Sequence, residues 1–457
     1  MKKLWPLLFT LVLFQNGISQ HADWMNLFNG KDLNNFEPLN GKAEFKVEDG
    51  CIVGISKIGT PNSFLATKQK YSDFILEFEV KVDTALNSGV QIRSNSTPSY
   101  RNGRVHGYQV EIDPSPRAFS GGIYDEARRG WLFPLSRNPK GQAAFRNGQW
   151  NYYHIEAIGN ILKTWVNGVQ CAKLADDMTG EGFIALQVHH ITAKKMEGAE
   201  VRWRNLRILT QNFQQHAWQD DPEAPQLSFL VNQLTDWEKR HGWRLLWDGK
   251  TTTGWRGAKL NHFPDKGWEI KDGVLTVLAT DGGESTGPGD IITQEQFSDF
   301  DLELEFMVTP GANSGIKYFV QPELNKKAGS AIGCEFQILD DERHPDAKKG
   351  VNGNRTLASL YDLIPADNLS VPGRGKQFKG VGVWNKARIV SRNGKVEHWL
   401  NGEKAVEYDR WSQMFRALAA YSKYKVWRNF GQWPQGHVLL QDHGNTVHFR
   451  SIKIREF

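Results

Sequence analysis

The chain has 457 residues, with 56 Lys and Arg against 51 Asp and Glu, and charges of both signs are interspersed along it. Because no block of one sign occurs, nucleic acid is excluded as an expected partner. This length exceeds what one hydrophobic core normally serves, so two domains of ~200 residues each are expected.

The first 19 residues have the pattern of a secretory signal peptide. Two lysines precede the uncharged run 4–14, and the small residues Gly17 and Ser19 follow it. The run is shorter than the ~20 residues that cross a bilayer, and no second run of that length occurs downstream, so no membrane span is expected. We expect cleavage near Ser19 or Gln20 and an exported protein, periplasmic or secreted.

Three cysteines, Cys51, Cys171 and Cys334, stand far apart in the sequence. They form no CxxC pair, so a cysteine zinc site is not expected. A disulfide between Cys51 and Cys171 is one possibility. Burial of all three as small apolar residues is the commoner fate of isolated cysteines.

One ordered series of motifs occurs twice along the chain. Each Asn-Gly pair in it stands between alternating runs, which is the sequence mark of a tight hairpin. The repeat predicts a first domain at 20–210, a linker at 211–242 and a second domain at 243–457. The matching stretches are 27–31 with 246–250, 72–80 with 298–306, the Asn-Ser-Gly triplets 87–89 with 313–315, 124–125 with 361–362, 150–151 with 384–385, and 166–168 with 400–402.

Short alternating strands dominate both copies, with frequent Gly and Asn turns and few helical stretches. This pattern is typical of two packed antiparallel sheets. We therefore predict an all-β protein, with two tandem jelly-roll β-sandwiches of the concanavalin A and laminarinase type joined by a short linker helix. The helix is predicted over 227–240, where apolar residues recur on one helical face.

Polar residues repeat at a spacing of two on two strands of each copy, which places them on one face of a sheet. In the first copy, one strand presents Gln109, Glu111 and Asp113, and another presents Gln187 with His189. The second copy repeats this with Glu335 and Gln337, and with Gln441 and His443. A single such strand is more often an exposed polar face, but the repetition favours a lined groove.

Both copies resemble the 3-keto-disaccharide hydrolase family, whose members are also described as 3-keto-glucoside 1,2-lyase/3-keto-2-hydroxy-glucal hydratase domains. The resemblance implies a jelly-roll fold and action on sugars whose C3 hydroxyl has already been oxidised to a ketone. It therefore also implies a separate sugar 3-oxidoreductase as functional partner. The stretches that carry it are 120–131 and 182–189 in the first copy, and 335–340, 359–362 and 436–444 in the second.

The chemistry that the resemblance implies is an elimination. A ketone at C3 acidifies the C2 proton, so a positioned base can form an enolate that expels the group at C1, and water can then add across the enone. Such a site needs a base near C2, donors for the enolate oxygen and an acid for the leaving group.

For the second module we assign Glu335 and His443 as candidate bases or as candidate ligands of a divalent cation. No organic cofactor is expected, and a divalent cation is the only cofactor considered. Asp340, with His344 in the following loop, is the candidate that completes the acid or cation site. The residues expected to orient the sugar are Gln337, Gln441, Tyr361, and Lys423 from the insertion 411–435.

For the first module the candidate catalytic residues are Glu111, Asp113 and His189. Gln187 and Tyr124 are expected to bind the sugar. Arg128 and Arg129 are candidate stabilisers of the enolate, although an adjacent arginine pair is often only a solvated loop. Both modules are expected to contribute to activity.

Two alternative functions remain at this point. A retaining glycosidase of the laminarinase type needs the motif E-x-D-x-x-E, and Glu111 and Asp113 begin it, but Pro116 stands where the second glutamate is required. The other alternative is a non-catalytic carbohydrate-binding protein. It would need aromatic platforms but no titrating group essential for turnover.

Overall fold

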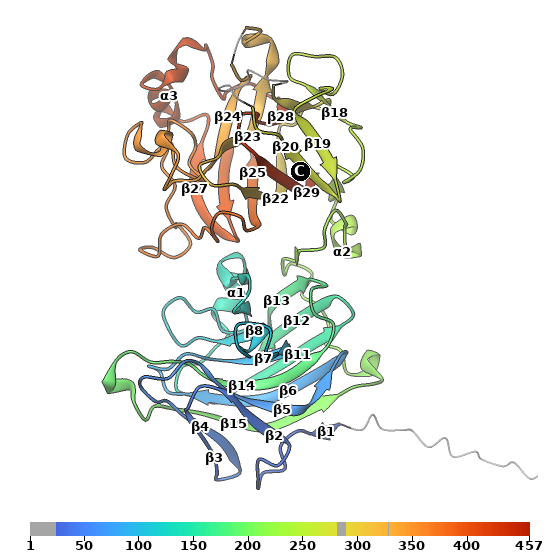
Figure 1. Ribbon diagram of the computed structural model, residues 1–457, viewed down its shortest axis with the longest axis vertical. Coiled ribbons are helices and arrows are strands. Elements are labelled where there is room, and N and C mark those ends of the chain that lie inside the picture. Colours follow the sequence, from blue (N-terminus) through green and yellow to red (C-terminus); the bar gives the residue numbers. More distant parts are fainter. Residues whose placement is uncertain (1–23, 281–288, 328) are drawn as a thin grey trace, which may run out of the picture.

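The computed structural model describes residues 24–280, 289–327 and 329–457 (Figure 1). The predicted signal peptide lies outside these residues. Within them, no helix is long and apolar enough to cross a membrane. The described residues form four sheets, two in each half of the chain, and their helices are short. The prediction of an all-β protein with two tandem β-sandwiches is confirmed.

The first module is a sandwich because its two sheets bury their facing sides in one core, to which Phe78 and Val80 contribute from one sheet and Val90 and Val110 from the other. Its named strands pair antiparallel, except for β13 with β16. The larger sheet has the order β16 (Leu227–Ser228), β13 (Val169–Ala175), β12 (Ile161–Val166), β11 (Asn151–Ile158), β6 (Phe74–Val82), β15 (Glu200–Leu209), β4 (Cys51–Ile55) and β3 (Glu44–Glu48), with β1 (Met25–Asn26) beside β15. The smaller sheet has the order β10 (Gly130–Phe133), β9 (Ile123–Glu126), β8 (His106–Ile112), β7 (Ser88–Asn95), β14 (Gly182–Val188), β5 (Ser63–Tyr71) and β2 (Phe36–Asn40).

The second module repeats this arrangement, with Phe306 and Ile389 of one sheet facing Ile316 and Phe336 of the other in a shared core. Its larger sheet has the order β19 (Trp268–Lys271), β20 (Val274–Val277), β29 (Val447–Glu456), β22 (Phe300–Val308), β25 (Asn385–Arg392), β26 (Lys395–Leu400) and β27 (Glu403–Asp409), with β17 (Arg244–Leu245) beside β29. Its smaller sheet has the order β18 (Trp255–Gly257), β21 (Ile291–Thr293), β28 (His437–Leu440), β23 (Asn313–Gln321) and β24 (Ile332–Leu339).

Helices occupy only short connections. The α-helices are α1 (Pro139–Gln142), α2 (Asp236–Arg240) and α3 (Gln413–Ala420). Single turns of 3-10 helix span Leu135–Arg137, Lys194–Met196, Phe213–Gln215, Pro322–Leu324, Pro345–Lys348 and Lys423–Val426.

The linker helix is shorter than predicted, because the apolar residues that suggested it serve two different structures. Leu227 is buried in the core of the first module, and β16 adds a parallel edge strand to β13. The helix begins only after Thr235, whose side chain accepts a hydrogen bond from the Glu238 amide in a capping box. The predicted range 227–240 is therefore helical only in α2.

All three cysteines are free and buried. The possible disulfide between Cys51 and Cys171 is thus wrong, and the expectation of buried thiols is confirmed. Cys171 and Cys334 belong to the cores of the first and second module, respectively.

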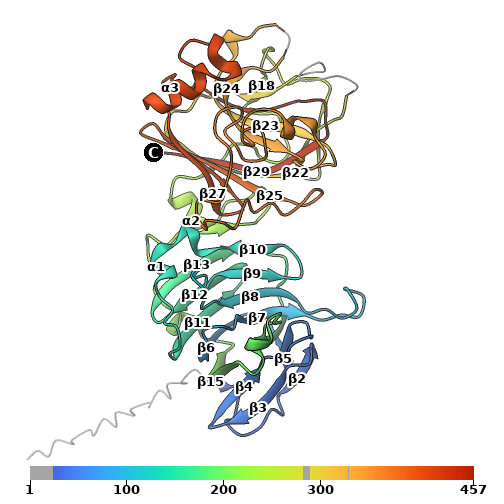
Figure 2. The same ribbon diagram turned by 90° about the vertical axis from the view of Figure 1, so that its left-hand side faces the viewer.

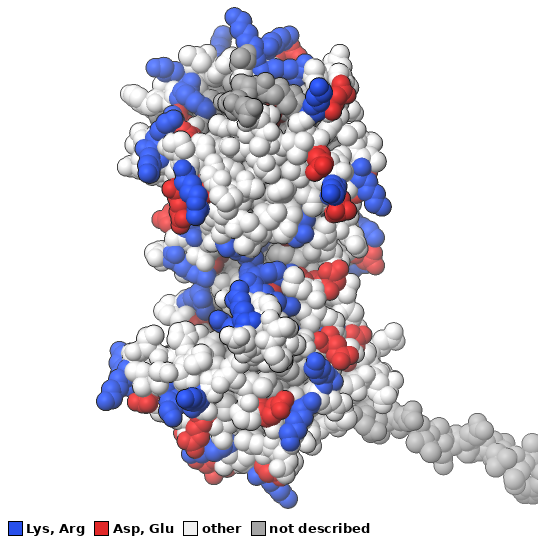
Figure 3. Space-filling view, viewed as in Figure 1, with Lys and Arg blue, Asp and Glu red and all other residues white. Residues whose placement is uncertain are grey.

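The two modules stack end to end, with α1 and α2 at their junction (Figure 2). Arg137 of the first module pairs with Glu303 of the second at 3.0 Å, and both side chains are buried. Nearby, Ser136 Oγ donates to the Gly402 carbonyl oxygen (2.9 Å), and Lys386 Nζ donates to the Ser228 carbonyl oxygen (2.5 Å). Basic side chains gather at this junction on the face shown in Figure 3. These contacts fix one edge of the second module against the first.

Candidate active site

A cavity of about 1380 Å³ lies on the outer face of the smaller sheet of the first module. Strands β8, β9 and β14 contribute Glu111, Tyr124 and Gln187 to its lining. We call it the junction cavity, because the second module supplies part of its wall. It is larger than the ~300–1,000 Å³ of most small-molecule sites. The wall residues from the second module are Arg374, Gln377, Phe378, Lys379, Asn401 and Glu403.

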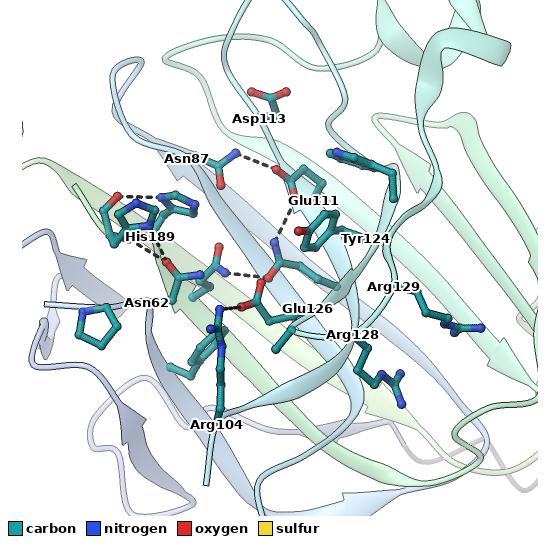
Figure 4. Close-up of a pocket in the computed structure, with 18 of the residues that line it drawn as sticks. Asn62, Asn87, Arg104, Glu111, Asp113, Tyr124, Glu126, Arg128, Arg129 and His189 are labelled. Atoms are coloured by element: carbon teal, nitrogen blue, oxygen red, sulfur yellow. Dashed lines mark hydrogen bonds and ion pairs between the residues drawn. The ribbon is translucent and has the colours of Figure 1, made fainter. Parts of the chain in front are cut away.

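Glu111 is buried at the sheet face and held from two sides (Figure 4). Its Oε1 accepts a hydrogen bond from Asn87 Nδ2 (2.7 Å), and its Oε2 accepts one from Gln109 Nε2 (2.9 Å). Burial raises the pKa of Glu111 to about 7, although Arg117, 3.4 Å from Oε1, and the two amides oppose the rise. A carboxyl group that ionises near neutral pH is suited to accept a proton from a carbon acid.

Three glutamine side chains form a relay that ends on Glu111. Gln109 Oε1 accepts hydrogen bonds from Gln91 Nε2 (2.6 Å) and Gln187 Nε2 (2.7 Å), so the Gln109 amide must direct its Nε2 at Glu111. Gly89 makes room for this arrangement, because a Cβ there would lie 2.5 Å from Gln109 Cδ. Gln187 Oε1 is buried and has no hydrogen-bond partner among the described residues. A buried acceptor of this kind is expected to receive a donor from a ligand.

Tyr124 and His189 line the same cavity. The Tyr124 ring lies beside Glu111 (Figure 4), and its hydroxyl has no hydrogen-bond partner in the described part of the chain. Burial and the neighbouring Glu126 raise the pKa of Tyr124, so its hydroxyl remains a proton donor. Burial lowers the pKa of His189, and its Nδ1 lies 2.8 Å from the His190 carbonyl oxygen, so the neutral ring carries its proton on Nδ1.

Asp113, Arg128 and Arg129 line the cavity but are held by other groups. Asp113 Oδ2 accepts a hydrogen bond from Arg117 Nε at 2.7 Å. Arg128 and Arg129 each donate to a carboxylate oxygen of Asp125 at 2.6 Å, and both point away from Glu111 in Figure 4. The structure therefore does not bring the arginine pair to the place where an enolate next to Glu111 would form.

The smaller sheet of the second module presents a corresponding outer face, but with different side chains. Gln337 and Gln441 both lie opposite Gly315, as Glu111 and Gln187 lie opposite Gly89. The carboxylate of this module, Glu335, occupies the position that Gln109 has in the first. Lys317 stands 3.7 Å from Glu335, where the first module has a glutamine. The buried carboxylate of the second module therefore faces a cation at close range.

Tyr361 and Lys423 come together in the second module, as the insertion was predicted to allow. Lys423 Nζ lies 4.1 Å from the centre of the Tyr361 ring. The Tyr361 hydroxyl is already engaged, because it donates to Asp346 Oδ2 at 2.6 Å.

His344 and His443 face each other with ring centres 5.8 Å apart. Burial raises the pKa of Asp340, but hydrogen bonds from the Gly311 amide and from Arg343 outweigh this and lower it, so Asp340 is a poor proton donor. Within the described ranges, no group of three or more His, Cys, Asp or Glu side chains is placed to hold a metal ion. Glu335 and His443 thus have no third ligand of these types in that part of the chain.

Several residues of the junction cavity were not assigned a role from the sequence. Asn87 belongs to the repeated Asn-Ser-Gly triplet, whose position before a groove strand was a usable signal. Arg117 follows the groove strand by five residues in a loop, where an arginine is common. Arg374 and Lys379 lie in the other module, and nothing in the sequence pairs them with Glu111.

A sequence profile of the 3-keto-alpha-glucoside-1,2-lyase-like domain matches residues 23–209 and 242–455. The chain belongs to this family. The resemblance seen in the sequence is confirmed for both modules, and the protein is carbohydrate-active, of the 3-keto-disaccharide hydrolase type.

A protein of Bacteroides thetaiotaomicron named 3-keto-disaccharide hydrolase is 37% identical over 238 residues, which cover 47% of this chain and 78% of that protein. Two solved structures from Parabacteroides distasonis, both provisionally described as glycosyl hydrolases, are 30% and 24% identical to this chain. They cover 50% and 47% of this chain and 99% of each of those chains, with TM-scores of 0.43 and 0.36.

Proposed function

We propose that the first module cleaves 3-keto-glycosides by elimination at C1 and C2, and that Glu111 is the base. The observation that carries this is the buried Glu111 carboxyl group with a pKa of about 7 in a cavity large enough for a glycoside. The substrate class comes from the family and from the name of the Bacteroides relative.

In the proposed first step, ionised Glu111 takes the C2 proton of the sugar, and the C2–H electrons form the enolate of the C3 ketone. The C1–O bond then breaks as the enolate collapses, and its electron pair leaves with the aglycone oxygen, which takes a proton from solvent water in the cavity. Tyr124 is the donor best placed to stabilise the enolate oxygen, because its hydroxyl stays protonated and has no partner among the described residues.

The second step reverses the proton transfer. Water adds to C1 of the enone while Glu111, whose carboxyl proton has exchanged with solvent, returns a proton to C2, so the sum is hydrolysis to the 3-keto sugar and the free aglycone. If the enone is released before water adds, the outcome is that of a lyase. Neutral His189 has an unprotonated Nε2 that is available to activate the water.

We assign this chemistry to the first module and not to the second because of the neighbours of the two carboxylates. Glu111 accepts hydrogen bonds from two neutral amides, and burial raises its pKa to about 7 even though the partly exposed Arg117 lies 3.4 Å from Oε1. Glu335 faces Lys317 at 3.7 Å, and the Lys317 side chain is itself buried. An adjacent ammonium favours the ionised carboxylate and makes it a weaker base. A separate sugar 3-oxidoreductase must supply the ketone, and the N-terminal sequence supports export of the protein.

The decisive experiment compares a 3-keto-glucoside with its unoxidised parent, in both anomeric forms, with and without chelator, and follows products by mass. In D₂O, elimination and rehydration place one deuterium at C2 of the released 3-keto sugar. Glu111→Gln is expected to lower turnover by the ~10²–10⁴ that a general base contributes, and Glu335→Gln is the matched variant. Equal cleavage of oxidised and unoxidised sugars, or product without deuterium, would overturn the elimination. Sugar binding without cleavage of any of them would favour a non-catalytic carbohydrate-binding protein.

A further inference from the structure

One wall of the junction cavity belongs to the second module, and this wall is built into the fold. Asn401 Nδ2 donates to the Gln377 carbonyl oxygen (2.6 Å), and the Lys379 amide donates to Asn385 Oδ1 (2.9 Å). Glu403, at the start of β27, binds Arg374. These contacts hold the wall segment in place, so it faces the site before any ligand arrives.

The lining of the cavity carries an excess of positive charge. Seven Arg and Lys residues stand against four carboxylic acids, and one of these acids, Glu111, is only partly ionised at neutral pH. The guanidinium groups of Arg128 and Arg129 are balanced by Asp125 and by Asp176, which lie outside the lining. The excess therefore has to be located among the remaining cations.

Two lining cations, Arg101 and Lys379, have no carboxylate within ion-pair distance in the described ranges, whereas Arg374 is paired with Glu403. Of these two, Lys379 lies on the wall that the second module supplies. Its Nζ is 5.6 Å from the centre of the Phe229 ring, and Arg129 approaches the same ring at 5.9 Å. Burial and the nearby Arg129 lower the pKa of Lys379 to about 8, so the amine is still mostly protonated at pH 7.

We propose that Lys379 of the second module forms, with Arg129, an aglycone subsite that selects glycosides carrying a negatively charged group such as a carboxylate. This rests on the proposed function, because it places the sugar at Glu111 and the aglycone at the module junction. A bound anion there would supply Lys379 with a negatively charged partner, which the described residues do not provide. The second module is then part of the first module's substrate site.

The test uses two synthetic 3-keto-glucosides that differ in one charge, with a 4-carboxyphenyl or a 4-carbamoylphenyl aglycone. For the full-length protein, kcat/KM is expected to be about 10- to 100-fold higher for the carboxyphenyl substrate, as for a charge-assisted contact. Lys379→Met is expected to remove this preference while changing the carbamoylphenyl reaction less than about threefold. Lys379→Arg keeps the charge and should retain most of the preference.

The matched control is Lys271→Met, because Lys271 is an exposed lysine on β19. It should leave both rates unchanged. Equal wild-type rates for the two substrates, or an equal loss on both in Lys379→Met, would overturn the subsite.

If neither substrate is cleaved, the proposed function has failed and the subsite is judged by calorimetry on the two unoxidised glucosides. Tighter binding of the carboxyphenyl glucoside that Lys379→Met abolishes would support the subsite by itself. Equal binding of the two would reject it.

Discussion

Replacement of Glu111 by Gln is expected to lower activity and, at alkaline pH, to raise stability relative to the wild type. Loss of a general base costs ~10²–10⁴ in rate, so kcat/KM for a 3-keto-glucoside should fall by that factor. The stability effect follows from the position of the pKa. Folding raises the pKa of Glu111 from 4.5 to about 7, so the folded protein binds this proton more tightly than the unfolded chain.

The sign and size of the stability effect can be worked out from this pKa. Between pH 4.5 and 7 the folded state binds more protons, so the wild type loses stability as the pH rises through this range. Each pKa unit corresponds to about 1.4 kcal/mol, so a fully ionised Glu111 costs the folded state about 3 kcal/mol. The cost disappears below the unfolded-state pKa and is complete above the folded-state pKa.

The glutamine variant lacks this titration. Its amide also meets the donors of Asn87 and Gln109, which costs roughly 1–3 kcal/mol at every pH. We therefore compare two pH values, because the difference cancels the constant term. The free energy of unfolding of Glu111→Gln, relative to wild type, should rise by about 2–3 kcal/mol from pH 5 to pH 8.

The assay is urea unfolding of both proteins at the two pH values, followed by tryptophan fluorescence. Glu335→Gln serves as the matched variant, because the Glu335 carboxylate faces the Lys317 ammonium group and the same change is not expected there. A relative stability that stays constant between pH 5 and pH 8 would refute the raised pKa. Full activity in Glu111→Gln would refute its role as the base.

Three further results are expected. The kcat/KM of the wild type should rise with pH through about 7 as Glu111 becomes ionised, and a flat profile from pH 5 to 8 would contradict this. Gln187→Leu should reduce kcat/KM about tenfold by removing an acceptor and an orienting donor, and an unchanged value would show that no ligand uses that oxygen. Arg137→Ala should lower the free energy of unfolding by about 2 kcal/mol. This cost is smaller than that of breaking an isolated buried ion pair, because two other basic residues still face Glu303. Faster proteolysis of the linker should accompany it, whereas an unaltered cleavage rate would mean that the pair does not hold the modules together.

Much of the fold was predictable because it rests on local periodicity. In β8 the residues Tyr108, Val110 and Ile112 are fully buried in the core, while Gln109 and Glu111 line the cavity on the other side. This alternation is readable from the sequence. The predicted extent of the linker helix was wrong because its apolar residues do not belong to one element. Some lie in a strand at a sheet edge and others in a short helix, and only the tertiary structure separates the two.

The candidate site was predictable in part. Strand parity brought Glu111, Gln187 and His189 to one face, and the structure places them in one cavity. The direction in which a loop side chain points could not be predicted from the sequence. Arg128 and Arg129, for example, form ion pairs with Asp125 and do not point at Glu111. The position of Lys379 in the cavity depends on how the two modules pack against each other. The residue pattern within a single module does not predict that packing.

The glutamine relay has a fixed sense, because each amide has only one orientation that satisfies its neighbours. Ser94 Oγ donates to Gln91 Oε1 (2.7 Å) at the start, and the last amide delivers its hydrogen to Glu111. Replacement of Ser94 by alanine would remove the donor that orients the Gln91 amide, and that amide could then rotate. In the proposed mechanism, the relay thus links the basicity of Glu111 to a serine that does not contact it.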